Sequence, residues 1–393
     1  MTKNWYSDLP KYYQEQIKKK GLDRLTPNRR DFVKGAATVA GAMALSSLPK
    51  VGHAATKLNY MCWEGYNDPR IVEPFEKEHN AELTFDLIVD SAGGFAKLAA
   101  GAYRDFDVVS TDSPWIMRMA PAGICEYLDP KDFADVYETF YPQFAAPFEP
   151  LMHEGKTAGL PTRWGWVGPT LNTDYSKPED WTSWDACFDK KNNGKIGVLD
   201  WGDWPILPMA LHAGINPYKE LDANELKEVR MVLRALFKNT RAIIGDLSVA
   251  QKGILDGSLV TLVGCGSYCT SALRKQGHKQ ILTIVPEPQH GLKQGIVWME
   301  ATAIVKDTDS PDLAKKLIKH VASDDACMVL SWTDFTCNVT PNSSVEAKYT
   351  AEQKDVLQVD YMWDAYNKSH FHDIAPNIDD MLAIWQEELS NAG

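Results

Sequence analysis

Hydrophobic and polar positions alternate along residues 58–120 in a way that predicts strands and helices in turn. Asp68 and Pro69 suit the cap and first turn of the first helix, and Pro74 inside it predicts a kink or an early end. The expected order is strand 58–63, helix from 69, strand 83–89, helix 95–103, strand 106–110 and helix 114–120. Such alternation is typical of a parallel sheet with crossover helices.

The rest of the chain continues the α/β pattern. The clearest helix is the amphipathic stretch 223–239. The other expected elements are two short strands within 156–173, a helix over 181–188, strands at 195–200, 259–264, 281–286 and 295–305, a helix that Ser310 and Pro311 start and that ends near Val321, and helices near 351–358 and 377–390.

The N-terminal 54 residues resemble an export signal rather than part of a fold. Residues 26–34 contain Arg29-Arg30 followed by Phe32, similar to a twin-arginine (Tat) address. A small-residue, uncharged run at 35–48 and the sequence Gly-His-Ala-Ala at 52–55 suit cleavage after Ala54. The alternative is a basic, Ala-rich surface helix. We therefore expect Tat export and a mature chain that starts near residue 55.

Removing this segment makes the remaining chain strongly acidic. Residues 1–54 hold 10 of the 41 Lys/Arg and 4 of the 53 Asp/Glu, so residues 55–393 carry a net charge of −18. Such a charge disfavours nucleic acid and anionic membranes as partners. It favours cationic solutes, unless it serves solubility alone. Residues 55–393 contain no apolar run of 18 residues, so this part is expected not to span a membrane.

The length of the chain and its cysteine pattern further restrict the class of protein. About 339 residues are too many for one small core, which predicts two lobes. The seven cysteines are odd in number and include no CxxC pair, so neither a metal site nor a redox motif is expected. The chain lacks the common sequence motifs of hydrolases, zinc proteases and nucleotide-binding enzymes, and their absence argues against an enzyme. His370 and His372 stand two apart without further Cys/His spacing, so zinc is not expected, and we expect no cofactor.

Aromatic residues and acids cluster at three expected strand ends and within one expected strand. The clusters are Trp63-Glu64-Gly65-Tyr66, Asp112-Ser113-Pro114-Trp115, Asp200-Trp201-Gly202-Asp203-Trp204 and Trp298-Met299-Glu300. Ligands bind at the carboxyl ends of strands in open parallel sheets. An aromatic face beside a carboxylate suits an organic ammonium ion. The alternatives are ordinary aromatic packing, and capping of a helix near Trp204 by Asp200 or Asp203. Glu300 is the strongest candidate, because an unpaired acid in an apolar strand is costly.

Several stretches resemble one family, the spermidine/putrescine-binding type of solute-binding protein of bacterial ABC transporters. They are LNYMCWEGY, AKLAAGAYRDFDVVSTDSPWIMRM, LPTRWGWVGPTLNTD with SWDACFD, and GIVWMEATAIVKDTDSPDLAKKLIKHVASDDA followed by NVTPN. Two departures stand out. Gly264 occupies a position where the family usually has Trp, and Asn338-Val339 stands where it has an aromatic residue before Thr-Pro-Asn.

The resemblance implies a type II-like periplasmic binding protein of two lobes with a ligand cleft between them. Lobe 1 would hold 55–163 and 300–345, and lobe 2 would hold 164–299 and 346–393. The implied and inferred ligand residues are Trp63, Tyr66, Asp112, Ser113, Trp115, Arg163, Asp200, Trp201, Asp203, Trp204, Trp298 and Glu300. Partners would be a membrane permease and an ATPase, and we expect the mature chain to be a periplasmic monomer.

The expected ligand is a polyamine such as putrescine or spermidine. Arg163 is the residue that complicates this expectation, because a cation is unwelcome beside a polyamine. Either Arg163 pairs with an acid at the lobe interface, or the ligand carries a carboxylate, as an amino-acid-like or betaine-like zwitterion does. A secreted enzyme on the same fold is the remaining, different class.

Overall fold

The computed structural model describes residues 55–88, 90–334 and 337–392, together with Lys11, Gln14 and Lys18. The expected Tat address and cleavage site, at 26–54, lie outside the described residues. Among the residues that are described, none of the helices has the length and apolarity needed to cross a membrane.

The first half of the molecule is built on a mixed sheet. Its strands run in the order β13-β12-β3-β1-β2, and β6 also pairs with β12. They are β1 (Thr56–Cys62), β2 (Ala81–Leu87), β3 (Val108–Asp112), β6 (Leu160–Val167), β12 (Gly295–Ile304) and β13 (Ser369–Phe371). β1 is parallel to β2 and β3, which confirms the predicted parallel unit, whereas β12 runs antiparallel to β3 and β6.

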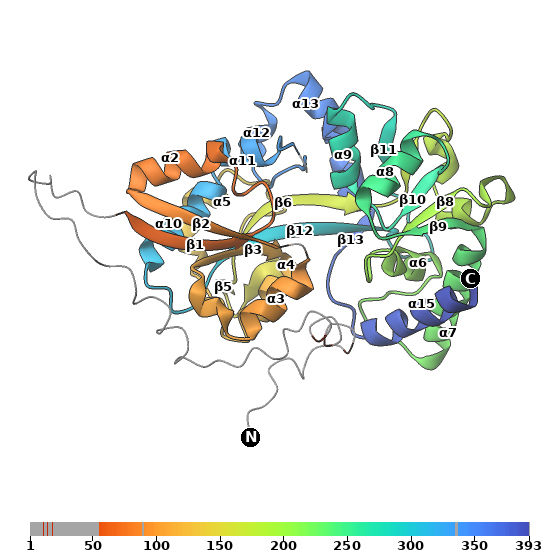
Figure 1. The fold of residues 1–393 in the computed structure, drawn as a ribbon, viewed down its shortest axis with the longest axis horizontal. Coiled ribbons are helices and arrows are strands. Elements are labelled where there is room, and N and C mark those ends of the chain that lie inside the picture. Colours follow the sequence, from red (N-terminus) through yellow and green to blue (C-terminus); the bar gives the residue numbers. More distant parts are fainter. Residues whose placement is uncertain are drawn as a thin grey trace, which may run out of the picture.

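Helices cover this sheet on both faces (Figure 1). They are α2 (Pro69–His79), α3 (Ser91–Ala99), α4 (Ser113–Met119), α5 (Ala134–Tyr137), α10 (Pro311–Val321), α11 (Asp324–Leu330) and α12 (Ser343–Glu346). α4 begins directly after β3, and residues 63–68 connect β1 to α2. Both junctions lie at the carboxyl ends of neighbouring parallel strands, where the first two predicted clusters stand.

The second half is built on a separate sheet with the strand order β11-β7-β10-β8-β9. Its strands are β7 (Thr170–Asn172), β8 (Ile196–Leu199), β9 (Thr240–Ile244), β10 (Thr261–Val263) and β11 (Ile281–Thr283). The helices around it are α6 (Ile206–His212), α7 (Ala223–Asn239), α8 (Leu247–Leu255), α9 (Ser267–Lys275) and α15 (Ile378–Ala392). The short hairpin β4 (Met152–His153) and β5 (Lys156–Thr157) stands apart from both sheets.

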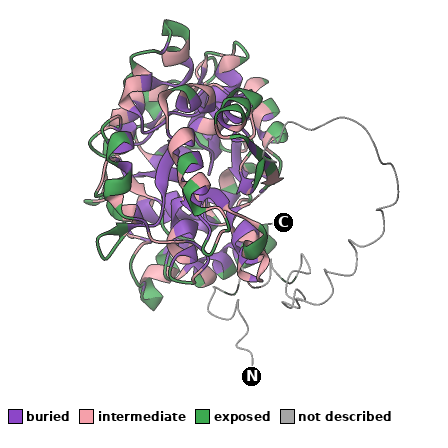
Figure 2. Ribbon diagram, turned by 90° about the vertical axis from the view of Figure 1, so that its left-hand side faces the viewer, coloured by how far each residue is buried: buried purple, intermediate pink, exposed green. Residues whose placement is uncertain are grey.

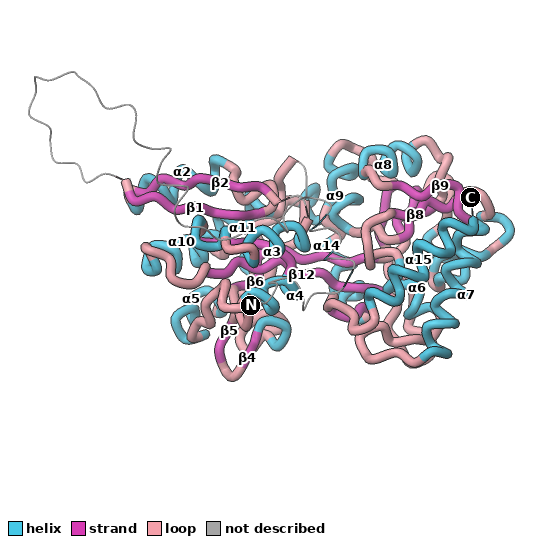
Figure 3. Tube along the Cα trace, turned by 60° about the horizontal axis from the view of Figure 1, so that its bottom comes forward, coloured by secondary structure: helices cyan, strands magenta, loops and turns pink. Residues whose placement is uncertain are grey.

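Two long strands, β6 and β12, run from one half of the molecule into the other (Figures 1 and 3). Every residue of both strands is buried. The predicted lobe boundaries, at 163/164 and 299/300, fall within these strands. The C-terminal helices pack on several parts: α13 (Ala351–Val356) on α9, α14 (Val359–Asn367) on β12 and β6, and α15 on α7. Figure 2 shows the strands buried at the centre and the exposed residues mainly on the outer helices and loops.

The local predictions succeed where capping and amphipathic patterns are strong. Asp68 accepts a hydrogen bond from the Arg70 backbone N–H and Pro69 begins α2, as predicted. Of the predicted kink or early end at Pro74, the early end is wrong, since α2 continues to His79. The reason is that Pro74 lies on the exposed face of the helix, where water can satisfy the carbonyl that loses its partner, while Ile71 and Phe75 anchor the buried face.

The predicted helix at 181–188 is also wrong in type. The chain forms two 3₁₀ turns there, Pro178–Trp181 and Trp184–Phe188. Trp181 and Trp184 are both fully buried. Ser183 interrupts the segment because its side chain caps the second turn at Asp185. The predicted helix 223–239 is confirmed as α7, and a capping box of Asp222 and Glu225 starts it.

Candidate ligand-binding site

The strand-end clusters lie along the boundary between the two halves. Asp112 is the last residue of β3, Trp63 follows β1, and the segment 200–204 follows β8. Asp203 is buried and Asp112 is partly buried, whereas Asp200 is exposed. Glu64 is exposed as well. The structure therefore brings Asp112 and Asp203 inward and leaves Asp200 at the surface.

Arg163 and Glu300 form a bidentate ion pair in the strands that join the two halves. They are opposite each other in the register of β6 and β12. The Nε of Arg163 donates to Oε2 of Glu300 at 2.9 Å, and Nη2 donates to Oε1 at 3.0 Å. The side chains are 2% and 9% exposed. Of the two readings of Arg163, the structure bears out the pairing with an acid at the interface.

Tyr66 and Gly65 enclose this ion pair. The hydroxyl of Tyr66 donates to Oε2 of Glu300 at 2.7 Å, and the guanidinium of Arg163 lies 4.8 Å from the Tyr66 ring centre. Gly65 has φ +104°, and a Cβ there would come within 3.2 Å of Nη1 of Arg163 and 3.1 Å of Thr333. Gly65 is therefore required by both backbone conformation and space.

Asp112 is the partly buried acid that the first half contributes. Its backbone pairs with Glu300 in the sheet, and the Ser91 hydroxyl donates to its Oδ2 at 2.8 Å. Burial raises the pKa of Asp112 to about 6, and the charges of Glu300 and Asp203 act in the same direction. Ionised Asp112 is thus held at a free-energy cost, which a bound cation would offset.

Asp203 is the acid that the second half contributes, and it binds His372. The Nε2 of His372 lies 3.2 Å from Oδ2 of Asp203, and both side chains are under a tenth exposed. Burial alone lowers the pKa of His372, but the hydrogen bond and charge of Asp203, with the charges of Asp112 and Asp373, raise it above its usual value. Capping of α6 by the Asp203 side chain is not observed, because no side chain caps that helix.

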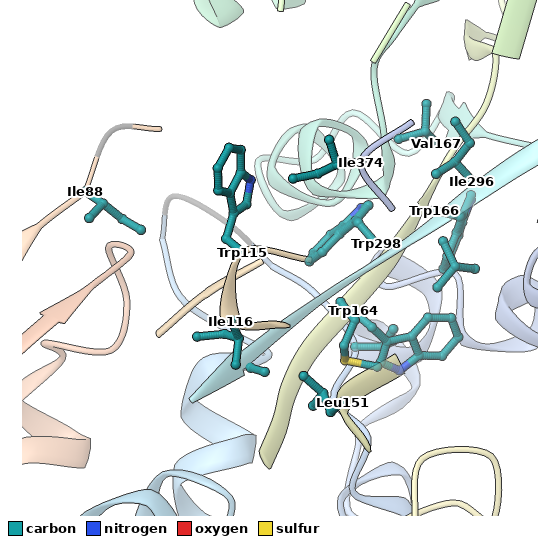
Figure 4. Close-up of a cluster of buried hydrophobic side chains, with 14 of the residues drawn as sticks. Ile88, Trp115, Ile116, Leu151, Trp164, Trp166, Val167, Ile296, Trp298 and Ile374 are labelled. Atoms are coloured by element: carbon teal, nitrogen blue, oxygen red, sulfur yellow. The ribbon is translucent and has the colours of Figure 1, made fainter. Parts of the chain in front are cut away.

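Aromatic rings surround these acids. Trp204 stacks on His372 with 4.2 Å between ring centres. Tyr268 packs against both Trp201 and Trp298, at 6.2 and 6.0 Å. In Figure 4, Trp115, Trp298 and Ile374 lie on one side of β12 and Trp164 lies on the other.

Two indole groups in this region have an unsatisfied donor. The buried Nε1 atoms of Trp63 and Trp298 form no hydrogen bond with any described protein atom.

Ser113, the remaining predicted site residue, is buried and begins α4 directly after Asp112.

Sequence reasoning considered His372 only as a zinc ligand and so missed its place beside Asp203. The sequence gives little indication that His372 lies there, because β13 has only three residues and pairs with a strand more than 70 residues earlier. Within the described part of the chain, no cluster of His, Cys, Asp and Glu is arranged to hold a metal ion. All seven cysteines are buried and unpaired.

Comparisons with known proteins agree on one family. Residues 70–357 match the family described as bacterial extracellular solute-binding protein. The chain is 27% identical over 311 residues to the putrescine-binding periplasmic protein SpuD of Pseudomonas aeruginosa, covering 73% of this chain and 77% of that protein. It is 21% identical over 334 residues to the spermidine/putrescine-binding periplasmic protein 1 of Haemophilus influenzae, covering 84% and 88%.

The fold is also that of solved binding proteins. The spermidine/putrescine transporter substrate-binding protein PotD of Streptococcus pneumoniae superposes with a TM-score of 0.69 at 16% identity, covering 86% of this chain and all of that one. This likeness confirms the expected two-lobed periplasmic binding protein fold. Proteins of this family bind a small molecule and work with a permease and an ATPase of an ABC transporter, and they are not enzymes. The chain belongs to the bacterial extracellular solute-binding protein family.

Proposed function

We propose that this protein captures a polyamine such as putrescine or spermidine in the cleft between its two lobes. The observation that carries the proposal is the grouping of two carboxylates around His372: Asp203, from the second half, lies 3.2 Å from its imidazole, and Asp112, from the first half, is near enough for its charge to act on both. Two acids in an aromatic surrounding provide charge neutralisation and cation–π attraction for ammonium groups. The polyamine names of the two sequence relatives support the same ligand class.

The state of Arg163 supports an amine over a zwitterion. A ligand carboxylate would need the guanidinium fork, yet Nε and Nη2 already bind both oxygens of Glu300. The neutralised pair also removes the objection that a cation would repel a polyamine. We assign Arg163, Glu300 and Tyr66 to the support of the cleft, and Asp112 and Asp203 to the ammonium groups.

The aromatic residues complete the proposed site. The rings that flank the acids are those of Trp63, Trp115, Trp201, Trp204 and Trp298, and Ser113 lies at the start of α4. Asp200, which is exposed, would stand at the rim. We propose that β6 and β12 act as the hinge, with lobe 1 holding 55–163 and 300–345 and lobe 2 holding 164–299 and 346–393. Closure would follow from ligand contacts made to both lobes at once.

The proposal extends to export and delivery. The twin-arginine segment supports Tat export of a folded monomer, cleaved after Ala54, to the periplasm. There the closed, loaded form would be read by the permease of its ABC transporter. Sequencing the N-terminus of the protein recovered from the periplasm tests this part, and a start at Ala55 is expected.

A thermal-shift screen tests the ligand class. A ligand that binds only the folded protein raises its melting temperature. Putrescine and spermidine should raise it, whereas glycine betaine and glutamate at equal concentrations should not. A shift with a zwitterion and none with any amine would overturn the proposal.

A further inference from the structure

His372 contacts Asp203 and lies near enough to Asp112 for its charge to act on the imidazole. Its backbone N–H donates to the carbonyl of Val297 at 2.8 Å, one residue before Trp298. β13, which it follows, is paired with the first residues of β12. The side chain of His372 is 6% exposed and stacks on Trp204. A backbone hydrogen bond to β12, a ring stack and a carboxylate contact thus hold His372 directly after β13.

The two ring nitrogens of His372 have different surroundings. Nε2 faces the Asp203 carboxylate at 3.2 Å, whereas Nδ1 is buried and has no hydrogen-bond partner among the described residues. A carboxylate only accepts, so Nε2 carries a proton in either charge state. When His372 is neutral, Nδ1 is then a buried lone pair, and when His372 is charged, Nδ1 is a second N–H donor.

An ammonium group can bond only to the neutral form of this histidine. An alkylammonium group has three N–H donors and no acceptor. It matches the lone pair of Nδ1 and is repelled by the charged ring. We propose, on the basis of the amine ligand proposed above, that Nδ1 of His372 accepts a hydrogen bond from the bound ammonium group and that binding expels the second imidazole proton to solvent.

The neighbouring charges favour such an exchange of one cation for another. Asp203, Asp112 and Asp373 all stabilise a positive charge at this position. Tyr218 interacts with Asp203 and Asp373 as well, and His370, two residues earlier, lies beside the Tyr218 ring. Arg163 and Glu300, adjacent to Asp112 in the sheet, compensate each other. In the absence of a ligand, the imidazolium serves as the counter-ion of Asp203, and the ligand replaces it.

Proton release on binding tests this proposal. Putrescine is titrated calorimetrically into the whole protein at pH 7.0 in phosphate and in Tris, whose ionisation enthalpies differ. Wild type and the control variant His370→Gln should release a substantial fraction of one proton per putrescine, and His372→Gln should release at least threefold less while still binding. Asp112 is mostly ionised at this pH, so it contributes little.

A second measurement does not depend on the variant. The ¹⁵N resonance of Nδ1 of His372 in wild type should move from the imidazolium to the unprotonated range when putrescine is added. Putrescine binding without proton release, or with release unchanged in His372→Gln, would overturn the role of His372 alone. Absence of putrescine binding to wild type would overturn the proposed function instead.

Discussion

Arg163 and Glu300 lie directly opposite each other on β6 and β12, and the guanidinium of Arg163 binds both carboxylate oxygens of Glu300. This pair lies in the strands that connect the halves. Each of the two residues alone could bind a ligand of opposite charge, but the pair they form has no net charge. In the proposed function, Asp112 and Asp203 are therefore the acids that would bind the cationic ligand.

Replacing Arg163 by Met should destabilise the protein strongly. The variant leaves the Glu300 carboxylate buried without its partner, and breaking a buried pair in this way costs about 3–5 kcal/mol. Urea unfolding followed by circular dichroism measures the change. The exposed pair of Arg70 and Asp68 provides the control, since Arg70→Met should cost at most about 1 kcal/mol. A similar small loss for both variants would contradict the prediction.

Replacing Glu300 by Gln should weaken putrescine binding at least tenfold, about 1.4 kcal/mol. The variant leaves an uncompensated guanidinium beside the site, which repels the ligand. The double variant Arg163→Met/Glu300→Gln removes that charge too and should regain affinity to within about threefold of wild type. If the double variant binds as weakly as Glu300→Gln, Glu300 contacts the ligand itself, as the sequence analysis expects.

Asp112→Asn should stabilise the ligand-free protein in a pH-dependent manner. The pKa of Asp112 is about 6 in the folded protein and near 3.9 in an unfolded chain. The folded state therefore binds the proton more tightly, and wild type loses stability as pH rises from about 4 to above 6. Melting temperatures at pH 4 and 7.5 measure the effect. The Asn variant should gain on wild type only at pH 7.5, and an equal difference at both pH values would contradict the prediction.

Lys275 links the two halves of the molecule. Its Nζ donates to the carbonyls of Trp332 and Thr333 at 3.0 Å each and to Oδ1 of Asp334 at 2.9 Å. α9, which carries Lys275, packs on β11 of the second sheet, whereas α11, which precedes Trp332, packs on α2 of the first half. In the hinge motion proposed above, these bonds would favour the closed arrangement.

Lys275→Met should therefore release bound putrescine about tenfold faster, the effect expected from losing a charged hydrogen-bond set worth about 1.5 kcal/mol. Stopped-flow tryptophan fluorescence measures the rate. Lys279→Met is the matched control, because Lys279 pairs with Asp355 instead. Equal release rates for wild type and Lys275→Met would show that this contact does not hold the cleft closed.

The sequence was sufficient to predict features that are encoded locally. The β1–α2 corner follows from Asp68 and Pro69, and α7 follows from its apolar stripe and capping box. α9 was not predicted, because its buried positions include Ser267, Thr270 and Arg274, so no apolar stripe marks it.

The long-range relationships were beyond prediction from local pattern. Arg163 and Glu300 are 137 residues apart, and His372 and Asp203 are 169 apart. From residue types, the pairing of Arg163 with an acid, not identified as Glu300, was one of two alternatives. Only the register of β6 with β12 decides between them. The pairing of β13 with β12 likewise brings His372 beside Asp203, and a strand of three residues is too short to predict this pairing.

Calorimetric titration with putrescine, comparing wild type with Asp203→Asn and Asp200→Asn, tests most directly whether the buried acids bind an amine. Asp203 is buried beside His372, whereas Asp200, three residues earlier, is exposed. We predict one putrescine per wild-type chain, binding at least tenfold weaker in Asp203→Asn, and an affinity within about threefold of wild type in Asp200→Asn. No putrescine binding to wild type, or equal affinity in Asp203→Asn and wild type, would contradict the proposed site.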